Sequence, residues 1–215
     1  PADIAHRTLA FARAMRTTPY VVRVAAFAAV LAVETGCATV ALIANLDRRD
    51  RSELRETMGN FLNGVTLRLD CRMQASFADW VRTVAHTVSE AVAHGETPLW
   101  QVMQVLRELG IRYPASIIVH SLVPGRLTFD GIESDIIDRD STGMPAGFTV
   151  TFREHDEDRD CSIAFDATAY DPVLVKAFRD RFISVLGAGL GTLMALGFAN
   201  DDVSRLLTIG PPGEI

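Results

Sequence analysis

The sequence predicts an α/β fold, a two-layer sandwich in which helices cover a mixed β-sheet. Apolar runs of strand length recur between stretches with helical periodicity. Glycine, proline and capping residues mark the ends of most of these segments. The chain has 215 residues, 48% of them hydrophobic, and can therefore bury a substantial core. The expected strands are residues 38–46, 61–70, 115–123, 148–154 and 161–166, with one short strand at 134–137 inside a long loop.

Five helices are expected around these strands. The segment 20–34 is apolar almost all round, so it should be buried on most sides. The other segments carry one apolar stripe each, which should pack toward the core; in the fourth helix this stripe is Leu99, Val102, Met103, Leu106 and Leu109. The expected helices are residues 3–15, 20–34, 76–94, one from Thr97-Pro98 to Leu109, and one from Asp171-Pro172 to Leu190.

Two strands are apolar along most of their length, which favours a sheet covered on both faces. The segment 38–46 is a continuous apolar run of this kind. In the segment 115–123, His120 has the same parity as Ile118 and Leu122. A lone histidine in such a strand is more often a neutral, hydrogen-bonded core residue than a catalytic base. We therefore expect a structural role for His120.

Composition excludes several classes of function. The net charge of −6 argues against a broad nucleic-acid-binding surface, and the densest basic cluster, Arg48, Arg49 and Arg51, is interleaved with acidic residues. The acidic segment 155–160 is interpreted as a solvated hairpin tip and not as a calcium loop, because it lacks the glycine and the terminal glutamate of such a loop. The run GAGLG at 187–191 lies in a helical stretch, so phosphate binding is not expected there.

Cysteine usage and hydropathy predict a cytoplasmic protein. Cys37, Cys71 and Cys161 are odd in number and lack metal-binding spacing, which favours reduced thiols over disulfides or zinc. The longest apolar stretch, residues 21–33, contains Arg23 and is too short to cross a bilayer. No membrane and no nucleic acid are expected as partners.

The segment 58–70, MGNFLNGVTLRLD, is the most informative stretch. From residue 61 its odd positions are apolar except for Asn63, whose carboxamide needs hydrogen-bond partners if it points into a core. Gly64 beside it would be able to mark a bulge, which would turn Asn63 outward. The pattern leaves two interpretations open, an asparagine that braces nearby backbone and an asparagine that lines a site.

This segment resembles a core motif of nonribosomal peptide synthetase condensation domains: hydrophobic, Gly, x, Phe, Val, Asn, Thr, then an apolar run to Arg. Upstream, Arg49 and residues 52–54 resemble the family's Gly-Arg-x-x-Pro-Glu-Leu, and downstream residues 94–100 resemble its His-Gln-Asp-Tyr-Pro-Phe-Glu. The similarity runs from about residue 9 to residue 207. The matching positions in the core motif are Met58, Gly59, Phe61, Asn63 and Arg68.

The resemblance implies one lobe of a chloramphenicol acetyltransferase-like fold, with a C-terminal condensation lobe at residues 1–200 and a linker at 201–215. The family's signature, His-His-x-x-x-Asp-Gly, belongs to the N-terminal lobe and does not occur in this sequence. No catalytic, cofactor-binding or metal-binding residue is therefore expected in this chain, and the isolated chain should be inactive. The resemblance assigns a substrate tunnel or lobe contact to Gly59, Phe61, Asn63, Gly64, His94 and Pro98.

The implied reaction is amide formation between aminoacyl or peptidyl thioesters carried by two carrier proteins. This lobe would supply tunnel wall and carrier-protein contacts, and the phosphopantetheine arms of the carriers would enter the tunnel. The implied partners are the N-terminal condensation lobe, peptidyl carrier proteins and an adjoining adenylation domain. Alternatives are an epimerising or degenerate condensation-like domain that recruits partners, and half of a free-standing acyltransferase.

Overall fold

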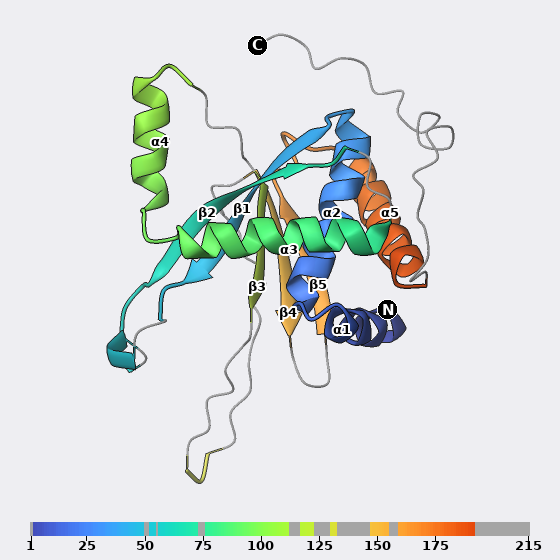
Figure 1. The fold of residues 1–215 in the computed structure, drawn as a ribbon, viewed down its shortest axis with the longest axis horizontal. Coiled ribbons are helices and arrows are strands. Elements are labelled where there is room, and N and C mark those ends of the chain that lie inside the picture. Colours follow the sequence, from blue (N-terminus) through green and yellow to red (C-terminus); the bar gives the residue numbers. More distant parts are fainter. Residues whose placement is uncertain are drawn as a thin grey trace.

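The structure is a computed structural model, and it describes residues 2–49, 52–54, 56–72, 76–111, 117–122, 130–132, 147–154 and 159–191. Within these residues, five strands form one mixed sheet in the order β2-β1-β3-β4-β5 (Figure 1). The pairs β1–β2 and β4–β5 are antiparallel, and the pairs β1–β3 and β3–β4 are parallel. The strands are β1 (Thr39–Asp47), β2 (Leu62–Asp70), β3 (Ile117–Leu122), β4 (Phe148–Glu154) and β5 (Arg159–Phe165).

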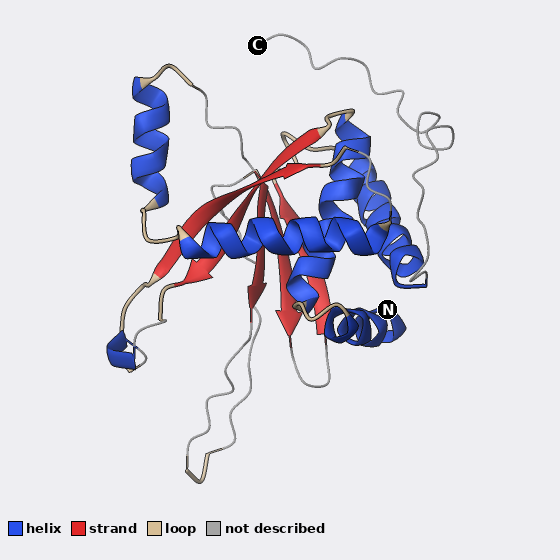
Figure 2. Ribbon diagram, in the orientation of Figure 1, coloured by secondary structure: helices blue, strands red, loops and turns tan. Residues whose placement is uncertain are grey.

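In the part of the chain that the structure describes, five α-helices and one short 3₁₀ helix accompany the sheet (Figure 2). Helices α2, α3 and α5 pack on one face of the sheet, where they cover alternate side chains of every strand. The α/β sandwich with a mixed sheet predicted from the sequence is confirmed. The helices are α1 (Ala2–Ala14), α2 (Pro19–Thr35), α3 (Phe77–Ala93), α4 (Leu99–Glu108), α5 (Pro172–Gly191) and η1 (Ser52–Leu54).

Helix α2 lies at the centre of the core, as its apolar sequence predicts. The Thr18 hydroxyl accepts a hydrogen bond from the amide of Val21 at 3.3 Å, and Pro19 occupies the first turn. Gly36 ends the helix in the left-handed conformation, with φ of 63°. Every residue from 21 to 30 is buried, including Arg23, whose guanidinium lies 5.2 Å from the ring centroid of Phe152.

Helices α3 and α5 complete the covering layer. Ser76 caps α3 by accepting a hydrogen bond from the amide of Asp79 at 3.1 Å, and the indole of Trp80 donates to the carbonyl of Ala25 in α2 at 2.8 Å. The GAGLG run lies in α5, as expected, and there Gly189 has a packing role. A Cβ at Gly189 would come within 2.7–2.9 Å of the buried Phe77 ring, so only glycine allows α3 and α5 to approach this closely.

The expectation that strand 38–46 is covered on both faces is wrong for the described residues. In β1, Val40, Leu42 and Ala44 are buried under the helices, whereas Ala41 and Ile43 on the opposite face are only half-buried. Small and apolar side chains on both faces made the run continuous. Such a run does not distinguish a covered face from one that lacks a helix.

The predicted packing of α4 is also wrong. None of its residues is buried, and Trp100 and Leu109 are 63% and 66% exposed. Figure 1 shows α4 standing apart from the sheet at the β2 edge. Amphipathic spacing indicates that a helix has an apolar face, but it does not say which surface covers that face.

Some expectations concern residues that the structure does not describe. The predicted strand at 134–137, residues 155–158 of the hairpin tip and the linker at 201–215 lie outside the described residues. Among the helices that are described, none alone has both the length and the hydropathy to span a membrane. Residues 3–14 and 19–35 meet those criteria only jointly, as a pair bent by 108°.

Candidate functional site

Asn63 ties the start of β2 to the connection between α3 and α4. Its Nδ2 donates to the carbonyl oxygens of Gly95 and Thr97, both at 2.9 Å, and its Oδ1 accepts from the amide of Leu99 at 3.0 Å. The β1–β2 register is continuous from Thr39 opposite Asp70 to Asp47 opposite Leu62, so Gly64 forms no bulge. The interpretation of Asn63 as a brace for neighbouring backbone is confirmed by these three bonds.

Two glycines let the α3–α4 connection pass close to the sheet. A Cβ at Gly64 would lie 2.6 Å from Leu99 Cδ2, and a Cβ at Gly95 would lie 2.6 Å from Leu46 Cδ1. Side chains at either position would push the connection away from β1 and β2. The glycines and Asn63 therefore act together, because the approach that the glycines permit brings the carboxamide into hydrogen-bonding range.

Arg49 organises the connection between β1 and β2. Its guanidinium donates to the carbonyls of Leu54, Thr57 and Gly59 at 2.7, 2.6 and 3.0 Å, and it lies 4.5 Å from the ring centroid of Phe61. The corner consisting of residues 46–49, 56–64 and 94–99 is thus held by hydrogen bonds, close glycine contacts and one stacked cation.

The six residues assigned to a tunnel or lobe contact all belong to this corner. His94 follows α3, where its amide donates to the carbonyl of Glu90 at 3.0 Å, and its side chain is exposed. Pro98 precedes α4, and its carbonyl accepts from the amide of Gln101 at 2.9 Å. The corner contains no general acid or base paired with a nucleophile among its described residues, and its assignment to a tunnel or lobe contact stays a prediction.

A second polar feature, which the sequence did not predict as a site, lies on the sheet face opposite α2, α3 and α5. On this face His120 of β3 pairs with Thr151 of β4, which pairs with Ser162 of β5, and Asn45 of β1 comes directly after the pair of Ala44 with Val119 of β3. Asn45 Nδ2 lies 3.0 Å from His120 Nδ1, and His120 Nε2 lies 2.7 Å from Thr151 Oγ1. We call Asn45, His120 and Thr151 the polar row.

His120 is held as a neutral imidazole in the polar row. The pKa of His120 is lowered, first by burial and second by the positive charge of Arg153. The expectation of a hydrogen-bonded histidine is confirmed, and the lowered pKa favours its neutral form. Its expected place in the core is wrong, since it lies half-buried on the face opposite α2, α3 and α5. The alternation along β3 predicts which residues share a face of the sheet, but it does not predict which face the helices cover.

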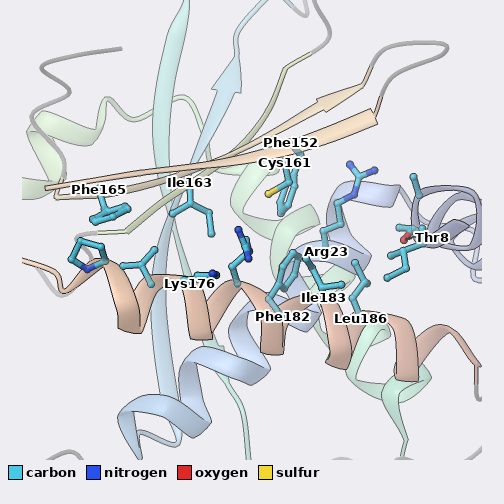
Figure 3. Close-up of a pocket in the computed structure, with 15 residues that line it drawn as sticks. Thr8, Arg23, Phe152, Cys161, Ile163, Phe165, Lys176, Phe182, Ile183 and Leu186 are labelled. Carbon is cyan, nitrogen blue, oxygen red and sulfur yellow. Dashed lines mark hydrogen bonds between the residues drawn. The ribbon is translucent and has the colours of Figure 1, made fainter. Parts of the chain in front are cut away.

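A cavity of about 540 Å³ lies on the other side of the sheet, between β5, α5 and α1 (Figure 3). Its lining is mainly apolar, with Phe152, Ile163 and Phe182 among the contributors, and Arg23 and Lys176 add positive charge. None of the six predicted site residues lines it. Because Phe152 and Ile163 face the helices, this cavity is separated by the sheet from the polar row.

The described residues offer little other chemistry. They contain no group of three or more His, Cys, Asp and Glu side chains placed to hold a metal ion. Burial, with a smaller contribution from Asp70, raises the pKa of Cys71 to about 12, which keeps this thiol protonated and unreactive near neutral pH. Tyr20, whose pKa burial raises, donates its hydroxyl to the carbonyl of Val119 at 2.9 Å and ties α2 to β3.

Comparisons with known proteins identify the family. The family model described as "Condensation domain" matches residues 1–192. Nonribosomal peptide synthetase kk1B of Curvularia clavata is 27% identical over 194 residues, covering 86% of this chain and 2% of that protein. Phosphinothricin tripeptide synthetase PhsB of Streptomyces viridochromogenes is 32% identical over 115 residues, covering 54% of this chain and 10% of that protein.

Solved structures share the fold. The first condensation domain of the CDA synthetase superposes with a TM-score of 0.77 at 22% identity, covering 91% of this chain and 43% of that chain. The SgcC5 protein of Streptomyces globisporus gives a TM-score of 0.73 at 19% identity, covering 89% of this chain and 46% of that chain. The chain therefore belongs to the condensation domain family of nonribosomal peptide synthetases, whose reaction is peptide bond formation. It spans less than half the length of these relatives.

Proposed function

We propose that this chain acts as the C-terminal lobe of a condensation domain and supplies one wall of the cleft in which amide bonds form. The observation that carries the proposal is the sheet face opposite α2, α3 and α5. None of α2, α3 and α5 packs on this face, where Leu99 at the start of α4 lies beside Gly64, and the face bears a neutral, hydrogen-bonded histidine in place of an acid–base pair. Such a face is suited to position reactants and to exclude water.

The proposed chemistry takes place between two carrier-bound substrates. The amine of the acceptor attacks the thioester carbonyl of the donor, a C–N bond forms, the C–S bond breaks, and the amine proton passes by way of a base to the leaving thiolate. The base is assigned to the His-His-x-x-x-Asp-Gly motif of an N-terminal lobe. Fixing the two substrates makes a bimolecular encounter effectively unimolecular, which is the contribution assigned to this lobe.

Exposed apolar side chains support contact with another lobe. Met58 and Leu62 in the corner are 94% and 61% exposed, and Trp100 at the start of α4 is 63% exposed. Large exposed apolar side chains are typical of protein–protein contact sites. We assign Met58, Leu62 and Trp100, together with Gly59, Phe61, Asn63, Gly64, His94 and Pro98, to the contact with the N-terminal lobe and the tunnel entrance.

The proposal includes further partners. Peptidyl carrier proteins would deliver their substrates on phosphopantetheine arms, and an adenylation domain would adjoin the lobe. In this proposal the arms and their carriers are exchanged at each turnover, so they act as substrates. A cytoplasmic location is part of the same proposal, since loaded carrier proteins must reach the cleft.

Reconstitution tests the proposal. The 215-residue chain and an N-terminal condensation lobe are purified separately, and amide formation between two loaded carrier proteins is measured with each lobe alone and with both together. The proposal predicts product only from the mixture, and sedimentation should show that the two lobes associate. Product from the chain alone would contradict it, as would a mixture that associates but inverts the donor stereocentre without joining the substrates, which would indicate the epimerising alternative.

A further inference from the structure

The hydrogen bonds of the polar row have a defined direction. The Asn45 amide nitrogen can only donate, so His120 Nδ1 must accept and the imidazole proton must lie on Nε2. Nε2 then donates to Thr151 Oγ1, which leaves the hydroxyl proton of Thr151 for another acceptor. Strand register fixes this order, because His120 lies directly opposite Thr151.

Both ends of the row keep hydrogen-bonding capacity. Thr151 makes no hydrogen bond within the described part of the chain other than the one from His120, and Asn45 Oδ1 accepts none there. The row therefore presents a donor on β4 and an acceptor on β1. These strands are two strand spacings apart, about 10 Å. The side chains that carry both ends are half-buried, so a ligand can reach them.

The surroundings favour an uncharged ligand. Ile43 and Ile118, opposite each other on β1 and β3, are half-buried on the same sheet face beside the row. Of the charged residues two positions along the strands from the row, Asp47 lies 3.8 Å from Arg49 Nε and Arg153 donates a hydrogen bond to Ser162 Oγ at 3.2 Å. Secondary amides are uncharged and supply both functions that the two ends need: the carbonyl of one amide can accept from Thr151 while the N–H of a second amide donates to Asn45. A chain with two amide groups is long enough to span about 10 Å, since extended chains rise about 3.3 Å per residue.

We propose that Asn45, His120 and Thr151 are positioning residues for an extended, amide-bearing chain that crosses this sheet face. Thr151 and Asn45 contact the chain, and His120 is the neutral link that keeps the Thr151 hydroxyl pointing outward as a donor. The inference rests on the proposed function, in which this face is a wall of the cleft. Two substrate parts carry such amides, the pantetheine arm and the peptidyl chain attached to it.

Nuclear magnetic resonance on the 215-residue chain tests the binding. Pantetheine and N-acetyl-glycyl-glycine amide are titrated separately at millimolar concentrations, and the signals of Asn45, His120 and Thr151 are followed. At least one probe should shift them in a saturable manner. Thr151→Val should weaken that binding about fivefold, as expected for one lost hydrogen bond, and Thr151→Ser should restore it.

Thr149→Val is the matched control, because Thr149 is on the same strand and faces the same way as Thr151. Its hydroxyl has no hydrogen-bond partner in the structure, so this variant should bind the probe like the original chain. Unfolding midpoints of all variants are compared, so that a loss of binding is not confused with a loss of fold.

The outcomes distinguish the pantetheine arm from the peptidyl chain as the ligand, and they test this inference separately from the proposed function. Shifts with pantetheine alone assign the row to the arm, and shifts with the dipeptide amide alone assign it to the peptidyl chain. Two results would overturn the inference: no shift with either probe, or long-range ¹⁵N–¹H spectra that show the His120 proton on Nδ1. Reconstituted amide formation is measured independently, so an active mixture with an unresponsive row would refute the inference and leave the proposed function standing.

Discussion

Replacing Asn63 with alanine should destabilise the protein by about 2 kcal/mol. The change removes three hydrogen bonds, two to the carbonyls of Gly95 and Thr97 and one from the amide of Leu99. Each is worth roughly 0.5–1.5 kcal/mol net, and the partly exposed bond to Thr97 belongs at the low end of that range. Urea unfolding should show a lower midpoint with an unchanged slope, and hydrogen exchange should be faster at the Leu99 amide.

Asn60→Ala is the control for this experiment. Asn60 lies three residues away in the same segment, but its side chain only accepts a local bond from the Leu62 amide at 3.0 Å. This variant should change stability by no more than about 0.5 kcal/mol. If Asn63→Ala were as stable as Asn60→Ala, the role of Asn63 as a brace would be refuted. If Asn63→Ala were fully stable but inactive in the reconstituted domain, Asn63 would have to be reassigned to catalysis.

Three further predictions use calorimetry or denaturant unfolding. Gly189→Ala should destabilise the protein by about 1–3 kcal/mol, because the added Cβ collides with the buried Phe77 ring. Gly187→Ala is the control and should be neutral or stabilising, since the nearest atom to its Cβ would be 3.6 Å away. Equal effects of the two variants would contradict the packing role of Gly189. Thr149→Val should stabilise by up to about 1 kcal/mol by removing a buried hydroxyl without a partner, and a clear loss would mean that the hydroxyl is satisfied. The third prediction concerns His120, whose pKa in the folded state is lowered from 6.5, so that the unfolded chain binds more protons below that pH. The free energy of unfolding should therefore decrease as the pH drops. His120→Gln should make this pH dependence weaker.

The pH prediction depends on the charges around His120. The charged residues on its sheet face whose side chains the structure describes are Asp47, Arg68, Asp70 and Arg153, and of these Arg153 contributes to the lowered pKa. Asp160 of β5 occupies the register position opposite Arg153. Arg153→Gln should therefore raise the pKa of His120 toward its ordinary value. A pKa that stays unchanged in this variant, measured from the imidazole resonances, would leave burial as the whole cause.

The sequence was sufficient to predict the helices and strands, but not to predict which of them pack against one another. Apolar periodicity, Thr18-Pro19 and Ser76 located the helices within a few residues, and the odd parity of Asn63 correctly indicated a carboxamide that needs partners. These are local signals. They depend on residues a few positions apart, which the periodicity of a helix or strand places on one face.

The polar row was missed because its members are distant in sequence. Asn45 and His120 are 75 residues apart, and they meet only because β3 inserts between β1 and β4 with one particular register. No local pattern fixes strand order. The error over α4 has a related origin, since the apolar stripe of Leu99, Val102 and Leu106 says nothing about the surface that it faces.

The most direct test of the central claim is the rate of amide formation after the histidines of this chain are removed. All five, His6, His86, His94, His120 and His155, are replaced by glutamine in the reconstituted domain. If this lobe positions substrates and the base belongs to the other lobe, the single-turnover rate should fall by no more than about tenfold, the share expected from disturbing the polar row. A glutamine in place of the second histidine of the His-His-x-x-x-Asp-Gly motif should abolish it. The opposite pattern, loss of turnover with the five replacements and survival with the motif variant, would contradict the account.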